Sequence, residues 1–312
     1  MSFVPLSEVR KTDGKMLLPG GLTRRLPPWF KVRMQRGPDY QDIRRIVDTL
    51  HLHTICEEAR CPNVWECWNA RTATFLILGD LCTRRCHYCA VTTGRPQAVD
   101  VEEPRRVADA VRTLGLRHAV ITSVNRDELE DGGASVFAET IRQIKLTTPS
   151  CTVEVLIPDF EGDETALATV AAEKPDILNH NIETVPRLFP SIRPQGRYCR
   201  SIELLARAKR LGLRTKSGLI VGMGETVEEV RAVMRDLRAV GCDILTIGQY
   251  LQPTKRHLPV ARFYHPDEFA ALKAEGLAMG FSHVESGPLV RSSYHAAEQT
   301  GDGCRTGGGR TV

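Results

Sequence analysis

The sequence predicts an α/β protein built as a partial (β/α)6 barrel, similar to a TIM barrel but incomplete. From residue 72 onward, six apolar and β-rich runs follow one another, and a segment with helical periodicity separates each run from the next. Strands that alternate with helices are typical of βαβ units that share a parallel sheet. Periodicity alone leaves a doubly wound sheet open as the alternative.

The expected strands are rich in β-branched and aliphatic residues, which suit a sheet covered on both faces. They span residues 74–78, 119–123, 152–157, 177–181, 215–221 and 244–249. The expected helices carry apolar residues three and four positions apart, so that one face of each helix can pack on the sheet. They span residues 104–114, 134–146, 163–173, 199–211, 226–240 and, after the sixth strand, 266–279.

A chain of 312 residues can hold one large domain of this kind with appendages. We expect three parts, which are an N-terminal arm over residues 1–70, the barrel over residues 71–285 and a C-terminal segment over residues 286–312. The arm lacks a sustained period and contains Pro19-Gly20-Gly21, so we expect it to be irregular and to wrap onto the rest. The glycine-rich tail from Ala296 is expected to be disordered.

The charge balance does not favour a nucleic-acid partner. Lysine and arginine exceed aspartate and glutamate by only 42 to 38, whereas nucleic-acid binders carry concentrated basic faces. No apolar run approaches the length of a membrane span, and the residues from Met1 to Pro5 do not begin a signal segment. We therefore expect a soluble, cytoplasmic protein with reduced thiols and no membrane contact, which argues against a disulfide framework.

Six of the ten cysteines form two sets of three. The first set is Cys56, Cys61 and Cys67, and the second set is Cys82, Cys86 and Cys89. Each set is one ligand short of closing a metal site, and an iron–sulfur cluster held by three thiolates keeps one iron open for another ligand. A structural zinc site is the alternative, although only Cys86 and Cys89 have the spacing of a zinc knuckle.

The second cysteine set follows the first expected strand directly. It therefore lies in the first βα loop, at the carboxyl end of the strands, where parallel α/β proteins place their chemistry. The second strand ends in Ser123, Asn125 and Arg126, which could hold the amino and carboxylate groups of a small ligand or cap the next helix. In the stretch that ends the fifth strand, Gly218 and Gly222 would let the backbone approach a flat ligand closely.

The motifs resemble those of a known enzyme superfamily. The second cysteine set has Cys-x3-Cys-x-aromatic-Cys spacing, with Tyr88 as the aromatic residue, and resembles the radical S-adenosylmethionine (SAM) enzymes. The stretch 218–225 matches the Gly-x-Ile-x-Gly-x-x-Glu pattern that those enzymes set beside adenine. From about residue 50 to residue 297 the chain is similar to the lipoyl synthase family. That similarity rests on both cysteine sets, on Arg291-Ser292-Ser293-Tyr294, and on the stretches 123–129 and 179–185.

Two departures from the family pattern stand out. Glu128 occupies a position where aspartate is expected. The acidic GGE motif of other radical SAM enzymes is absent after the second strand, which leaves open the residues that bind the amino group of SAM.

The resemblance implies a barrel of the radical SAM type with two 4Fe-4S clusters and SAM as cofactors. Cys82, Cys86 and Cys89 would be the catalytic set, because their cluster would bind SAM. Cys56, Cys61 and Cys67 would hold an auxiliary cluster, with Ser292 of the C-terminal segment as its fourth ligand. The residues expected to contact SAM are Tyr88, Ser123, Asn125, Arg126, Asn179, Glu183, Gly218, Gly222 and Glu225.

The implied activity is that of a sulfurtransferase, which inserts sulfur at carbon 6 and carbon 8 of a protein-bound octanoyl-lysine to give lipoyl-lysine. The implied partners are an octanoylated lipoyl carrier domain of the 2-oxoacid dehydrogenase or glycine cleavage H protein type, an electron donor and a protein that rebuilds the auxiliary cluster. One alternative is another radical SAM enzyme with an auxiliary cluster, which would insert sulfur as biotin synthase does or modify peptide or RNA. Another is a non-catalytic metal-binding module.

Overall fold

The structure, a computed structural model, describes residues 4–5, 16–17, 23–24, 26–32 and 37–299. Its main sheet has eight strands in the order β14-β13-β12-β11-β10-β9-β6-β5. Six of these strands are the predicted ones. They are β6 (Thr74–Ile77), β9 (His118–Ser123), β10 (Thr152–Leu156), β11 (Ile177–Asn179), β12 (Thr215–Val221) and β13 (Ile244–Gln249).

The six predicted strands pair in parallel, each with its neighbour along the chain. In a doubly wound sheet the order of the strands reverses at a switch point. Here the strand order follows the chain from β6 to β14 without such a reversal, which excludes that alternative and confirms the partial barrel. The sequence missed two edge strands, β5 (His53–Thr54), which pairs antiparallel with β6, and β14 (His283–Gly287), which pairs parallel with β13. Only Val284 of β14 is buried, so that strand carries no apolar pattern to recognise.

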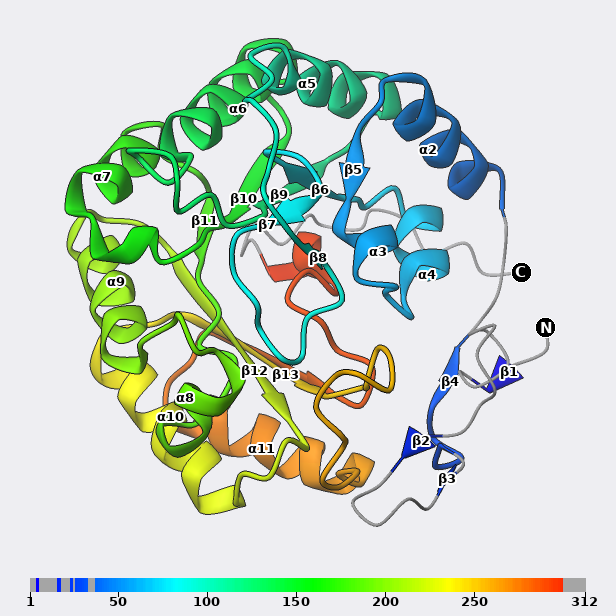
Figure 1. Cartoon of the computed structure of the whole chain (residues 1–312), viewed down its shortest axis with the longest axis vertical. Helices are drawn as coiled ribbons and strands as arrows, with labels where there is room; N and C mark the ends of the chain where they lie inside the picture. The colour runs from blue at the N-terminus through cyan, green and yellow to red at the C-terminus, as the bar shows by residue number, and fades with distance from the viewer. Residues whose placement is uncertain (1–3, 6–15, 18–22, 25, 33–36, 300–312) are drawn as a thin grey trace, which may run out of the picture.

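The six predicted helices lie in an outer ring around the strands (Figure 1). They are α5 (Glu103–Leu114), α6 (Ala134–Thr147), α7 (Glu164–Ala172), α9 (Tyr198–Arg210), α10 (Val227–Ala239) and α11 (Pro266–Ala278). Their starts follow local chemistry. The Thr226 side chain caps α10 in a capping box with Glu229, and Pro266 opens α11 at a position where no backbone donor is needed.

Shorter elements occupy the loops and the first residues. The short helices are η1 (Phe160–Gly162), η2 (Pro186–Leu188) and α8 (Phe189–Ile192). Three small pairs of two-residue strands are β1 (Val4–Pro5) with β4 (Lys31–Val32), β2 (Met16–Leu17) with β3 (Thr23–Arg24), and β7 (Leu81–Cys82) with β8 (Thr92–Thr93).

The expectation of an irregular N-terminal arm was wrong for its second half. Residues 38–49 form helix α2 (Pro38–Thr49), and the cysteine region forms α3 (Ile55–Glu58) and α4 (Val64–Asn69). Tyr40 of α2 packs against two rings of α4, with centroid distances of 4.9 Å to Trp65 and 5.1 Å to Trp68. Helices α3 and α4 are too short to show a sustained period, and tertiary packing stabilises them. Helix α2 does bury Tyr40, Ile43 and Val47 at helical spacing, a pattern that the prediction overlooked.

The C-terminal tail also begins differently from the prediction. Residues 296–299 form η3 (Ala296–Gln299), in which Ala296 and Gln299 are buried, so disorder from Ala296 was wrong for these four residues. The remainder of the tail, from residue 300, lies outside the described residues.

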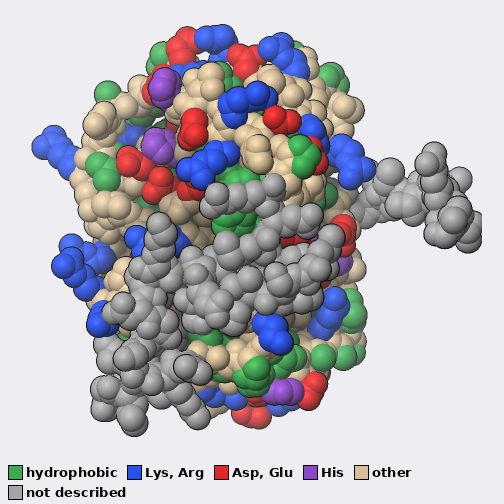
Figure 2. Space-filling model, turned by 90° about the vertical axis from the view of Figure 1, so that its right-hand side faces the viewer, with side chains coloured by type: hydrophobic (Ala, Val, Ile, Leu, Met, Phe, Trp, Pro, Cys, Tyr) green, Lys and Arg blue, Asp and Glu red, His purple; other side chains and the backbone are tan. Residues whose placement is uncertain are grey.

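No helix in the described part of the chain is long and apolar enough to cross a membrane. On the face shown in Figure 2, basic and acidic side chains are interspersed over the described surface.

Candidate functional site

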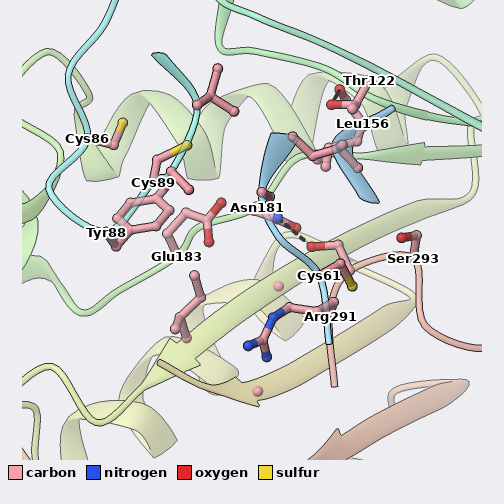
Figure 3. Close-up of a pocket in the computed structure, with 18 of the residues that line it drawn as sticks. Cys61, Cys86, Tyr88, Cys89, Thr122, Leu156, Asn181, Glu183, Arg291 and Ser293 are labelled. Atoms are coloured by element: carbon pink, nitrogen blue, oxygen red, sulfur yellow. Dashed lines mark hydrogen bonds between the residues drawn. The ribbon is translucent and has the colours of Figure 1, made fainter. Parts of the chain in front are cut away.

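A cavity of about 320 Å³ lies at the carboxyl ends of the parallel strands. Five of the six clustered cysteines line it, which are Cys56, Cys61, Cys82, Cys86 and Cys89. In Figure 3, Cys86, Tyr88 and Cys89 lie on one side and Cys61 and Arg291 on the other, with Asn181 and Glu183 between them. The fold thus brings both cysteine sets to one place, although they occupy different elements.

The second cysteine set is held by the polar stretch that follows β9. The Asn125 backbone N–H donates to Cys82 Sγ over 3.3 Å, and the Thr83 backbone N–H donates to the Asn125 carbonyl over 3.1 Å. Hydrogen bonds to sulfur tune the electronics of iron–sulfur ligands. Asn125, predicted to face a ligand, therefore also supports the thiol of Cys82.

Arg84, between the first two cysteines of this loop, fixes the loop to two strand ends. Its guanidinium binds Asp127 through Nε and Nη2 at 2.8–3.0 Å, and its Nη1 lies 2.7 Å from Asp159 Oδ1. The side chain of Arg84 is only 2% exposed and that of Asp159 is fully buried. Although burial favours the neutral acid, the charge of Arg84 keeps the pKa of Asp159 below its usual value.

The other end of the loop is held by segments from elsewhere in the chain. The carbonyl of Cys89 accepts a hydrogen bond from His257 Nε2 at 2.8 Å, and the carbonyl of His87 accepts from the Leu258 backbone N–H at 3.1 Å. His87 in turn donates its N–H to the carbonyl of Ile192 over 2.9 Å. Contacts from elsewhere in the chain therefore hold the cysteine loop at both ends.

The first cysteine set joins α3 and α4. The Cys61 backbone N–H donates to the Cys56 carbonyl over 2.9 Å, which closes the turn between them. Burial, then the neighbouring Cys61, raises the pKa of Cys56 to about 12. Burial, then the neighbouring Cys61 and Cys56, also raise the pKa of Cys67, which does not line the cavity.

The second set shows the same behaviour. Burial and, after it, the neighbouring thiols Cys86 and Cys82 raise the pKa of Cys89 to about 12, and burial raises the pKa of Cys86. A bound, positively charged metal centre would favour the thiolate forms that an iron–sulfur cluster requires. Burial also raises the pKa of the isolated Cys242, so the grouping of three thiols in each set is what makes them candidate cluster ligands.

A site for a single metal ion needs at least three ligand side chains close together. Within the described residues, no three His, Cys, Asp or Glu side chains are grouped as one bound metal ion requires. An iron–sulfur cluster places its ligands on separate irons and does not demand that grouping.

Glu183 lies at the centre of the cavity in an uncommon backbone conformation. Its φ angle is 68°, and it exchanges backbone hydrogen bonds with Gly218 and Ile220, each of 2.8 Å. Non-glycine residues held in this region carry strain of about 1–3 kcal/mol and concentrate at functional sites. Burial raises the pKa of Glu183, while the charge of Arg193 and hydrogen bonds from Asn181 and Tyr88 oppose that rise.

Five of the nine residues predicted to contact SAM line the cavity. They are Tyr88, Ser123, Asn125, Glu183 and Gly218. Sequence reasoning did not single out Arg193, whose Nη1 donates to the Asn181 carbonyl at 2.9 Å inside the cavity. It follows α8 in a loop without a recognisable motif, so no local signal could have found it.

The other four predicted residues lie outside the cavity lining. Arg126 donates to the backbone carbonyls of Leu78 and Gln97, and Asn179 donates to the buried Glu154 over 3.2 Å.

The last two of these residues build a turn. Glu225 accepts hydrogen bonds from the backbone N–H groups of Gly222, at 2.6 Å, and Met223, at 2.9 Å. Gly222 and Glu225 thus shape the turn after β12 without reaching the cavity.

The C-terminal segment folds back over the arm. Asn63 Nδ2 donates to the Leu289 carbonyl over 2.7 Å, and the Tyr294 hydroxyl donates to Glu66 Oε1 over 3.1 Å. This brings Ser292 into the cavity lining, where the Asn181 side chain donates to its Oγ over 2.6 Å, the dashed line in Figure 3.

Comparisons with protein families agree with this architecture. The model of the radical SAM superfamily matches residues 76–237, and the model of the N-terminal domain of lipoyl synthase matches residues 5–61. The chain is 65% identical to the lipoyl synthase of Rubrobacter xylanophilus, over 89% of this chain and 88% of that one. It is 57% identical to the lipoyl synthase of Symbiobacterium thermophilum, over 92% and 91% of the two chains.

Solved structures support the fold alone. Methylornithine synthase (PylB) matches with a TM-score of 0.52 at 14% identity, over 79% of this chain and 81% of that one. HydG, a maturase of the [FeFe]-hydrogenase, matches with a TM-score of 0.54 at 13% identity, over 84% and 74% of the two chains.

Proposed function

This chain belongs to the lipoyl synthase family of the radical SAM superfamily, and from that premise we propose how its residues divide the reaction. The chain is a radical SAM sulfurtransferase that inserts sulfur at carbon 6 and carbon 8 of a protein-bound octanoyl-lysine to give lipoyl-lysine. The observation that carries the division is that both cysteine sets reach one cavity from different elements.

Cys82, Cys86 and Cys89 hold the 4Fe-4S cluster that binds SAM. When bound, this cluster supplies the electron for SAM cleavage and hence the hydrogen-abstracting chemistry. The protein contributes a rigid loop, because Arg84 and His257 fix it from both sides. Rigid placement matters because a reacting group must lie close to its target in the right orientation.

Cys56, Cys61 and Cys67 hold the second, auxiliary 4Fe-4S cluster, with Ser292 as its fourth ligand. This cluster supplies the sulfur that enters the product. The supporting observation is that the C-terminal segment lies against α4 through Tyr294 and places Ser292 in the same cavity as Cys56 and Cys61.

The SAM contacts come from the residues that line the cavity. Tyr88, Ser123, Asn125, Glu183 and Gly218 keep the role predicted for them. Asn181 takes the place of Asn179, whose side chain is engaged with Glu154. Arg126 donates to the Leu78 carbonyl, and Glu225 accepts from the Gly222 backbone N–H. We propose that Arg126, Gly222 and Glu225 hold these loops in place and do not contact SAM.

The same cavity can receive the octanoyl chain, for which the sequence offered no candidate pocket. Apolar side chains line it from four different segments, namely Ile55, Val91, Leu156 and Val290. An apolar wall of this kind removes hydrocarbon from water and excludes water from the reacting carbons.

The rim of the cavity favours a protein-bound substrate. Residues 81–99 and 250–266, which flank the cavity, contain no aspartate or glutamate. Arg60, Lys255 and Arg256 are exposed there and have no ion pair within the described residues. We propose that this basic rim, with Arg85 and Arg95 of the cysteine loop, receives the acidic face of the carrier domain.

We propose three classes of partner and a cellular location. The carrier is of the 2-oxoacid dehydrogenase or glycine cleavage H protein type, and an electron donor and a cluster-rebuilding protein complete the cycle. A cytoplasmic location is the corresponding expectation.

The test is a single-turnover assay under anaerobic conditions, read by product mass. A carrier domain bearing octanoyl-lysine is expected to become the lipoyl form, whereas free octanoate reacts poorly because it lacks the contacts that position the chain. Without a rebuilding protein, product should be no more than stoichiometric with the enzyme. Equal conversion of both substrates would contradict a carrier-dependent reaction.

A further inference from the structure

Asn181 joins the two cysteine sites through its side chain. Its Nδ2 donates to Ser292 Oγ over 2.6 Å (Figure 3). Its backbone carbonyl accepts from Arg193 Nη1 over 2.9 Å. Asn181 follows β11, whereas Ser292 follows β14, and two strands separate β11 from β14 in the sheet. With 8% of its surface exposed, Asn181 makes this contact where little water competes for it.

The orientation of the Asn181 amide follows from its neighbours. The amide nitrogen donates to Ser292 Oγ, and the same side chain is hydrogen-bonded to Glu183. The amide oxygen points instead toward Gly218. A Cβ atom on Gly218 would lie 2.6 Å from Asn181 Oδ1 and 2.8 Å from Thr246 Oγ1. Gly218 therefore leaves the space that this amide occupies.

We propose that Asn181 is a positioning residue for Ser292 and that Gly218 is required because it leaves room for the Asn181 amide. The inference rests on the proposed function, in which Ser292 is the fourth ligand of the auxiliary cluster. A serine hydroxyl can rotate among three staggered positions, and one directional hydrogen bond selects one of them. Partners that orient a metal ligand in this way typically change metal affinity by about 10–100-fold.

The test measures iron release from the auxiliary site alone. The full-length protein carries Cys82→Ala, Cys86→Ala and Cys89→Ala, so that only the first cysteine set can hold a cluster. Asn181→Ala and Gly218→Ala are added separately. Asn181→Ala removes the amide that donates to Ser292, and Gly218→Ala places a Cβ atom against the oxygen of that amide. Both are expected to speed iron release to a ferrous chelator by about 10–100-fold.

The matched control is Ser293→Ala, on the same segment. The Ser293 hydroxyl makes no side-chain hydrogen bond within the described residues, so its removal should leave the release rate at that of the parent. Ser292→Ala provides the benchmark for complete loss of the ligand.

A second readout does not require iron. Hydrogen exchange of the metal-free protein should show faster exchange at the amides of Arg291 to Tyr294 in Asn181→Ala, because the segment loses its link to β11. Release at the parent rate in both Asn181→Ala and Gly218→Ala would overturn the inference while leaving the auxiliary site intact. A parent that holds no iron would instead overturn the ligand assignment of the proposed function, and this inference with it.

Discussion

The two cysteine sets differ in what surrounds each thiol. Cys86 lies beside Tyr88, Glu183 and Arg193, which line the cavity with it. Cys61 lies beside Cys56 and close to the charge of Arg291. At the scale of single residues, the proposed function assigns SAM cleavage to the second set and sulfur supply to the first.

Replacing one thiol in each set tests that separation. Cys86→Ala should abolish SAM cleavage and leave iron at the first set, because only the second set binds SAM. Cys61→Ala should still cleave SAM but give no lipoyl product, since it lacks the sulfur source. The measurements are deoxyadenosine, iron content and product mass under anaerobic conditions. Deoxyadenosine at the parent level in Cys86→Ala, or full lipoyl yield in Cys61→Ala, would refute the division.

His180 predicts a pH dependence of stability. Its Nδ1 lies 2.9 Å from the Ile157 carbonyl and its Nε2 lies 2.9 Å from Ser201 Oγ. Burial, then the charge of Arg193, lowers the pKa of His180 to about 4. Below its unfolded pKa of about 6.5 the unfolded chain binds a proton that the folded chain rejects. Stability should therefore fall as pH drops from about 6.5 toward 4, by up to about 1.4 kcal/mol per pH unit.

The measurement is urea unfolding of the metal-free protein between pH 7.5 and pH 5, values chosen to bracket the unfolded pKa of about 6.5. His180→Gln removes the titrating group, so its stability should depend less on pH than that of the parent over this range. Parallel pH profiles for the two proteins would show that His180 does not contribute.

At the scale of elements, one buried guanidinium, that of Arg84, holds the cysteine loop between β7 and β8. Arg84→Lys keeps the charge but loses the fork that binds Asp127 and Asp159 together. Arg84→Lys should therefore lower iron loading at the second cysteine set, and Arg84→Ala should lower it further. Arg85→Ala is the matched control, because Arg85 is exposed and has no ion pair within the described residues. Iron content with the spectrum of the SAM-binding cluster is the measurement, and unchanged loading in Arg84→Ala would contradict this role.

The strands also enclose a buried ion pair below the cavity. Lys216 Nζ of β12 lies 2.9 Å from Glu154 Oε1 of β10, and Asn179 of β11 donates to the same oxygen. Neither Lys216 nor Glu154 is exposed. Lys216→Met should destabilise the protein by about 3–5 kcal/mol, because the buried carboxylate loses its lysine partner and keeps only Asn179 and, at 3.6 Å, His118.

Urea unfolding checks this value against two comparisons. Adding Glu154→Gln to Lys216→Met should recover much of the loss, since the unpaired charge is then removed. Lys174→Met, at an exposed lysine, should change stability by less than about 0.5 kcal/mol. A Lys216→Met variant as stable as the parent would contradict the importance of the pair.

At the scale of the whole molecule, the basic rim predicts salt-dependent recognition of the carrier. Lys255→Glu combined with Arg256→Glu should raise KM for an octanoylated carrier domain, and added salt should do the same to the parent. A short octanoyl-lysine peptide lacks the acidic face, so its KM should change much less. Equal KM changes for carrier and peptide would show that the rim does not bind the carrier.

Local patterns in the sequence determined the strands, the helices and the two cysteine sets. Six strands could be predicted because each carries its own apolar run, and the first βα loop could be predicted because Cys82 comes shortly after β6 ends at Ile77. Strand β14 could not, because only Val284 is buried in it and pairing with β13 is what makes it a strand. Helix α2 was overlooked although Tyr40, Ile43 and Val47 have helical spacing.

Only the tertiary structure decided which side chains reach the site. Asn179 is the last residue of β11, whereas Asn181 lies two residues beyond the strand, in the lining of the cavity. The first therefore binds Glu154, and the second reaches Ser292 at the cavity. Arg84 likewise finds Asp127 and Asp159 only because neighbouring strands end at one edge. Local sequence determines elements by short-range propensity and periodicity, whereas contacts between residues far apart in the chain depend on how the sheet curves and where its strands end.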